Sequence, residues 1–72
     1  MDIRQVMAGN LRRIRKEKGF SQEALAFECG IHRTYVSGVE RGIRNPTIMI
    51  VAKIAVALDV PASALLEVFA SD

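Results

Sequence analysis

The chain has 72 residues, of which half are hydrophobic, and its ten basic and eight acidic residues give a net charge of +2. A chain of this length predicts one domain over residues 1–72, and its hydrophobic content excludes a disordered tail. It is too short for most enzymes, which need a cleft lined by several converging groups. A single cysteine excludes an internal disulfide and fits a reducing cytoplasm, where we expect the protein.

The sequence predicts neither a signal peptide at its N-terminus nor a membrane-spanning segment. Residues 1–10 are charged and lack a long apolar run, which is unlike a signal peptide. The longest apolar stretch, Ile48 to Leu58, is interrupted by Lys53 and is far shorter than the ~20 residues of a membrane span. We therefore expect no membrane association, and no cofactor or small-molecule ligand is indicated.

The charge is unevenly distributed along the chain. Residues 1–53 carry all ten basic residues and five acidic ones, a net +5, whereas residues 54–72 carry three acidic residues and no basic one. This pattern suits a protein that turns a basic face toward a polyanion. Solvated helix surfaces with a chance distribution of charge would account for the totals equally well.

Apolar residues recur at helical spacing, and the sustained alternation that is typical of strands is missing, so the predicted fold class is all-α. Ser21 and Thr47 predict helix starts, while Gly19, Gly30 and Gly42 predict helix ends. The predicted helices cover about residues 3–18, 22–29, 32–41, 48–58 and 62–69.

Residues 22–41, QEALAFECGIHRTYVSGVER, contain two short helices around a central glycine. Ala26 is small where a second helix must cross closely, and Gly30 permits the tight turn between the helices. Ile31, Val36 and Val39 are apolar where the second helix must seat on the first. This combination predicts a helix-turn-helix.

Two strings extend this pattern over most of the chain: RKEKGFSQEALA (Arg15 to Ala26) and GIHRTYVSGVERGIRNPT (Gly30 to Thr47). With the helical region up to Leu66, they resemble the Cro/cI-type (lambda-repressor-like) helix-turn-helix regulators, which are five-helix DNA-binding domains. The string RTYVSGVERGIRNPT is particularly similar to the controller proteins of restriction–modification systems, which are stand-alone dimeric regulators. The resemblance implies a sequence-specific transcriptional regulator of double-stranded DNA rather than an enzyme.

The third predicted helix would lie in the major groove if the resemblance holds. Arg33, Thr34 and Ser37 then face the bases, because they lie opposite the apolar Val36 and Val39. An arginine can donate two hydrogen bonds to guanine O6 and N7, and a threonine can contact a base or a thymine methyl. A surface arginine that contacts only phosphate is the alternative for Arg33.

Gly38 departs from the pattern of many members of this family, which carry a long polar, base-reading residue there. Glycine cannot make that contact, weakens the helix by about 1 kcal/mol relative to Ala, and permits closer approach of the backbone. Tyr35 permits two interpretations: contact with the DNA, or packing at the edge of the domain.

Other residues are expected to position the protein on the phosphate backbone without reading sequence. For the arginines among them, a solvated surface position is the alternative. These candidate residues are Gln22, Arg41, Arg44, Asn45 and Thr47. The resemblance further implies a structural ion pair between Arg15 and Glu40.

The fourth predicted helix is more apolar than one buried face requires. We expect an inward stripe of Ile48, Val51, Ala52, Ala55 and Leu58. The remaining apolar positions predict an isologous homodimer reading an inverted repeat, unless the fifth helix covers them. The candidate interface residues are Met49, Ile50, Val56, Leu66, Val68 and Phe69.

Two other classes of function compete with DNA binding. The first is an enzyme, in which Cys29 and His32, three residues apart, would form a metal site or a nucleophile–base pair. Gly30 breaks the helix between them, and there is no second Cys or His to complete a metal site. A protein-interaction module, such as an antitoxin that also binds its own promoter, would use the apolar fourth and fifth helices. The sequence contains no extra segment for wrapping a toxin, so DNA binding is favoured.

Overall fold

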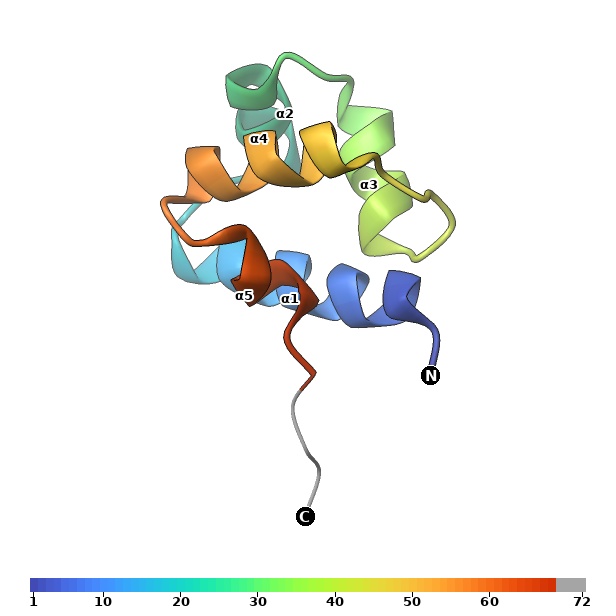
Figure 1. Cartoon of the computed structure of the whole chain (residues 1–72). Coiled ribbons are helices and arrows are strands. Elements are labelled where there is room, and N and C mark those ends of the chain that lie inside the picture. Colours follow the sequence, from blue (N-terminus) through green and yellow to red (C-terminus); the bar gives the residue numbers. More distant parts are fainter. Residues whose placement is uncertain (69–72) are drawn as a thin grey trace.

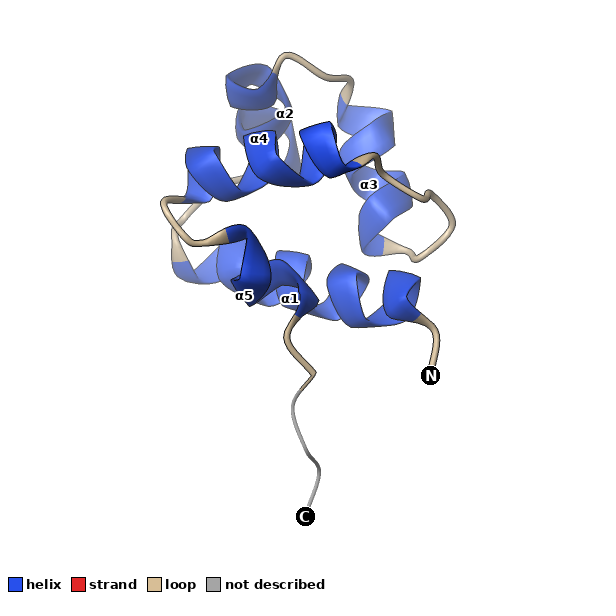
Figure 2. Cartoon of the chain, in the orientation of Figure 1, coloured by secondary structure: helices blue, strands red, loops and turns tan. Residues whose placement is uncertain are grey.

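The computed structural model describes residues 1–68, and within this range all regular structure is helical (Figure 2). The all-α prediction is confirmed. The helices are α1 (Ile3–Glu17), α2 (Gln22–Cys29), α3 (Arg33–Glu40), α4 (Ile48–Leu58) and α5 (Ala62–Leu66).

Each helix contributes a fully buried side chain to a single shared core. α1 packs against α3 and α5, α2 packs against α3 and α4, and α4 also packs against α5 (Figure 1). Burial of this apolar surface is the main force that holds the short helices together, since helices of this length are marginal alone. These fully buried side chains include, in chain order, Leu11, Leu25, Val36, Ile54 and Leu65.

Local capping interactions set the helix ends close to the predicted positions. Ser21 Oγ accepts a hydrogen bond from the Ala24 backbone N–H at 2.9 Å, and Thr47 Oγ1 accepts one from Ile50 N–H at 3.2 Å. Gly30 ends α2 with φ +67°, a left-handed conformation in which a side chain would be strained. The turn between α2 and α3 is therefore of the tight kind that a helix-turn-helix requires.

The buried face of α4 differs from the predicted stripe. Val51, Ala55 and Leu58 are buried as expected, but Ile48 and Ala52 are exposed. Ile54 is fully buried, and the row of residues 50, 54 and 58, spaced four apart, faces the core. The adjacent row of 48, 52 and 56 faces outward, because rows on a helix are separated by rotation about its axis.

The last helix is shorter than predicted. α5 ends at Leu66 rather than near residue 69, and Glu67 has an extended backbone with φ −70° and ψ 130°. The Asn10 side chain occupies this end of the helix, where Nδ2 donates to the carbonyls of Leu65 at 3.0 Å and Glu67 at 2.9 Å. The free carbonyls at the end of α5 are thus bound by α1 instead of by a further helical turn.

Among residues 1–68, no helix combines the length and the apolar character needed to cross a bilayer.

Candidate nucleic-acid interface

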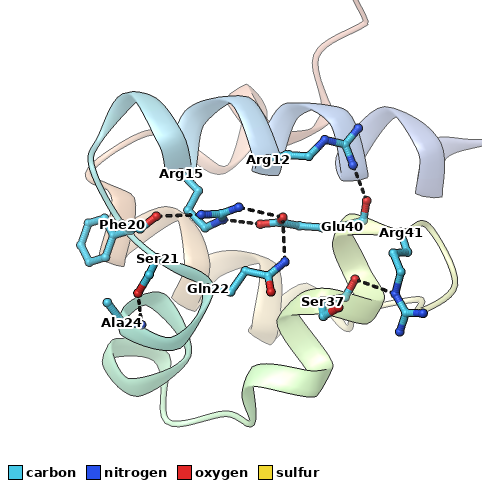
Figure 3. A network of polar contacts seen from close by, with 9 residues as sticks. All are labelled: Arg12, Arg15, Phe20, Ser21, Gln22, Ala24, Ser37, Glu40 and Arg41. Atoms are coloured by element: carbon cyan, nitrogen blue, oxygen red, sulfur yellow. Dashed lines mark hydrogen bonds and ion pairs between the residues drawn. The ribbon is translucent and has the colours of Figure 1, made fainter.

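α3 is fixed to α1 by a buried ion pair. Arg15 Nε lies 2.5 Å from Glu40 Oε2, and Arg15 Nη2 donates to Glu40 Oε1 at 3.1 Å. Arg15 Nη1 also donates to the Phe20 carbonyl at 2.8 Å. Glu40 is only 3% exposed, so the paired charges and their hydrogen bonds determine how the last turn of α3 meets α1 (Figure 3).

Two residues outside the ion pair complete this network. Gln22 Nε2 donates to Glu40 Oε1 at 3.1 Å, and Arg12 Nη1 donates to the Glu40 carbonyl at 2.7 Å (Figure 3). The Gln22 amide nitrogen is therefore engaged inside the protein, and α1, α2 and α3 are joined at one carboxylate. A phosphate contact by Gln22 stays a prediction, and its side chain has a structural partner already.

The exposed face of α3 carries the residues predicted to read bases. Arg33 and Thr34 form the first turn and are exposed, and Ser37 lies half-buried one turn after Arg33. The opposite face buries Val36 and Val39 against the core. α3 therefore presents a short polar surface whose orientation is set by its buried side.

Arg44, in the loop after α3, is exposed to solvent, but its side chain also lies along α3. Its guanidinium carbon is 5.7 Å from the centroid of the Tyr35 ring, a distance compatible with a cation–π contact. Tyr35 is half-buried and packs on the core. The structure thus brings together two of the predicted DNA-contacting residues.

The remaining candidates lie near the end of α3 and the start of α4. Arg41 is exposed, and its Nε donates to the Ser37 carbonyl at 3.4 Å (Figure 3). Asn45 is exposed in the loop, and Thr47 caps α4. Basic and polar side chains therefore continue from α3 to the N-terminus of α4, where backbone N–H groups favour an anion.

A separate, apolar surface covers the outer side of α4 and continues onto α5. Among the predicted interface residues, Met49 is 72% exposed, Val56 is 80% exposed, and Leu66 and Val68 are also exposed. Ile50 is half-buried and packs on the core, so most of its side chain is already covered within the chain. Phe69 lies outside the described residues.

An apolar groove adjoins this surface. It has a volume of about 400 Å³ and lies between the start of α1, the start of α4 and α5, where Ile3, Ile48 and Leu66 line it. Ile48 was predicted to face the core, but it is 88% exposed and belongs to this outer apolar surface.

Cys29 and His32 do not form a shared site. Cys29 is buried, and burial is the main cause that raises the pKa of its thiol. His32 precedes α3 at the N-cap position and is exposed. Within the described part of the chain, no group of three metal-binding side chains is assembled.

Sequence reasoning missed Asn10 and Arg12. Asn10 is a buried polar residue between Met7 and Ile14 on the inward face of α1, and buried amides need partners in the protein. A polar residue at a core position was thus a usable signal for the contact with α5. Arg12 carried no such signal, since its contact with the Glu40 carbonyl depends on the docking of α3.

Comparisons with known proteins agree with this geometry. A family model described as Helix-turn-helix matches residues 11–65. Control protein C.BamHI of Bacillus amyloliquefaciens is 46% identical over 67 residues, covering 92% of this chain and 83% of that protein. The crystal structure of the restriction-modification controller protein C.AhdI from Aeromonas hydrophila matches with a TM-score of 0.84 at 45% identity, covering 86% of this chain and 94% of that one.

A hypothetical transcription factor of Neisseria meningitidis serogroup B is 51% identical over 65 residues, which is 90% of this chain. This chain spans 61% of that protein's length. These relatives are regulators of transcription and controller proteins, not enzymes. The chain belongs to the helix-turn-helix family, in the Cro/cI-type group that includes restriction–modification controller proteins.

Proposed function

We propose that the protein binds an inverted-repeat operator as an isologous homodimer, with one α3 in each of two successive major grooves. The observation that carries this proposal is the two-sided character of α3. Its inner side is locked by Val36, Val39 and the Glu40 network, while Arg33 and Thr34 are free to meet DNA. A recognition helix needs this rigidity, because base contacts demand accurate placement of the donors.

Within this function, Arg33, Thr34 and Ser37 read bases. The protein is positioned on the phosphate backbone by Arg41, Arg44, Asn45 and the N-terminus of α4 at Thr47. Arg33 stands at the N-terminal end of α3, the end that contacts base edges in helix-turn-helix proteins. Arg41 and Arg44 follow at the other end, so contacts on both sides of the groove would set the depth of insertion.

The homodimer would form on the exposed apolar surface of α4 and α5. Met49 and Val56 project outward from α4, and Leu66 and Val68 extend the surface beyond it. Hydrophobic side chains gathered in this way favour association, and a two-fold axis makes the same surface serve both protomers. Such a dimer must place its recognition helices about 34 Å apart to read half-sites one turn apart.

We infer that the regulated genes belong to a restriction–modification system. The likeness to Control protein C.BamHI over 92% of this chain supports this inference. Control would then depend on the concentration of the protein and on its dimerisation.

Selection from a random pool of duplex DNA, at physiological salt, tests the proposed function. We expect enrichment of an inverted repeat, with a spacing of one helical turn between half-sites. Enrichment of a single asymmetric half-site would contradict the homodimer. Failure to retain any duplex would contradict DNA binding and would favour the antitoxin-like alternative, in which the apolar surface binds another protein.

A further inference from the structure

The side chain of Arg44 lies directly over Gly38. An ideal Cβ added to Gly38 would lie 2.5 Å from Arg44 Cγ and 3.3 Å from Arg44 Nε. These separations are shorter than van der Waals contact, so Arg44 occupies the space that any other residue at position 38 would need. Gly38 is buried by this arrangement, although it lies in the helix that carries the exposed base-reading residues.

Backbone hydrogen bonds fix the position from which the Arg44 side chain starts. The N–H groups of Ile43 and Arg44 donate to the Gly38 carbonyl at 3.0 and 3.3 Å. The Gly42 N–H donates to the Val39 carbonyl at 3.0 Å, which completes a helix-ending motif. Because the Arg44 backbone is bound to the residue that its side chain covers, Cγ could avoid a new Cβ only by rotation of the side chain.

The far end of Arg44 meets Tyr35, which lies three residues before Gly38 on the same side of α3. The guanidinium carbon is 5.7 Å from the ring centroid, and the ring is itself packed on the core. Tyr35 therefore offers a supported aromatic surface for the cation, and Gly38 leaves the route to it open.

We propose that Tyr35 and Gly38 form a seat that holds the Arg44 guanidinium on α3, beside the base-reading residues. Position 38 lies one helical turn after Thr34, on the same side of α3. Because Gly38 has no side chain, Arg44 covers α3 at this point. Tyr35 and Gly38 are then positioning residues for Arg44. The benefit for DNA binding, which rests on the proposed function, is that the cation is ordered before the DNA arrives.

The seat can be tested without DNA by NMR of the free protein. Protons on the side chain of Arg44 should show upfield ring-current shifts, because its guanidinium lies over the face of the Tyr35 ring. Gly38→Ala should move these resonances toward random-coil values while the fold is retained, since alanine is the better helix former. Unshifted Arg44 resonances in the unmodified protein would overturn the proposal.

The role of the seat in binding is tested with a double-mutant cycle. The probes are a fluorescein-labelled mixed-sequence duplex of 24 base pairs at low salt, and the inverted-repeat duplex enriched from the random pool. Gly38→Ala should weaken binding about tenfold, as Arg44→Ala should, because each removes one placed charge-assisted contact. In the Arg44→Ala background, Gly38→Ala should have no further effect.

Gly9→Ala provides the matched control. Gly9 also lies within a helix, α1, but an added Cβ would meet no atom within 4 Å. This variant should bind both duplexes as the unmodified protein does. An equal loss of affinity from Gly38→Ala in both backgrounds would overturn the proposal, because Gly38 would then act independently of Arg44.

The two proposals fail in different ways. If the unmodified protein bound neither duplex while the Arg44 resonances were shifted, the DNA-binding proposal would fail and the seat would stand as a feature of the fold. If the protein bound DNA and Gly38→Ala bound it equally well, the seat would have no part in binding.

Discussion

Arg15 and Glu40 are ion-paired across the interface of α1 and α3, with Arg15 Nε 2.5 Å from Glu40 Oε2. Both side chains are largely buried, so removing one partner leaves a charge without compensation. We expect Glu40→Leu or Arg15→Met alone to lower the free energy of unfolding by about 3–5 kcal/mol. The Arg15→Met/Glu40→Leu double variant should recover most of that loss, as measured by urea denaturation. A double variant whose loss equals the sum of the single losses would contradict the coupling.

Asn10 joins α1 to the end of α5. Asn10→Asp replaces the donor that serves the Leu65 and Glu67 carbonyls by an acceptor, so these groups lose their partner. We expect destabilisation by about 1–3 kcal/mol and faster amide hydrogen exchange in α5. Asn45→Asp, an identical change at an exposed position, is the control and should leave stability nearly unchanged. Equal stability of the two variants would show that the Asn10 contacts contribute little.

Arg33, the first residue of α3, and Arg44, in the loop after α3, should differ in their effects on DNA binding. Arg33→Ala should cost about 1–3 kcal/mol and relax the base preference at one position of each half-site. Arg44→Ala should weaken binding to all sequences and reduce the slope of log K against log salt by about 1. Fluorescence anisotropy at several salt concentrations, with matched and mismatched duplexes, measures both quantities. Equal relaxation of base preference in the two variants would contradict this division of roles.

The exposed surface of α4 predicts the oligomeric state. Val56→Glu places a charge within the proposed interface and should give a folded monomer in analytical ultracentrifugation. Phe27→Glu is the matched control, because Phe27 is 84% exposed on α2 and is not among the proposed interface residues. Phe69→Glu tests the extension of the interface beyond the described residues. Dimerisation of Val56→Glu at the unmodified affinity would exclude this surface.

The Cys29 thiol should be unreactive in the folded protein. Burial raises the pKa of Cys29 above its ordinary value of 9.0, so the folded state keeps the proton to higher pH than the unfolded state does. The corresponding stability is fully present below pH 9 and is lost as pH rises through the folded pKa. Alkylation by iodoacetamide at pH 8 should be much slower than in 6 M urea. Cys29→Ala should reduce the loss of stability between neutral and alkaline pH.

The ends of most helices could be predicted from the sequence because the signals that set them are local. Ser21 and Thr47 each accept a hydrogen bond from a backbone N–H three residues away. Gly30 adopts its left-handed conformation within a single residue. The string from Gly30 to Thr47 carried both this local pattern and the resemblance to the family. Neither depends on how distant parts of the chain are arranged.

The tertiary structure decided what distant residues do to one another. Ile54, rather than Ile48 or Ala52, faces the core, because the positions of α2 and α5 determine which side of α4 is covered. The Asn10 side chain donates to the Leu65 carbonyl at the end of α5, 55 residues later in the chain. Local spacing predicted that these segments are helical and amphipathic. The rotation of each helix about its axis, and the partners of its polar side chains, depend on neighbours that only the folded chain brings into contact.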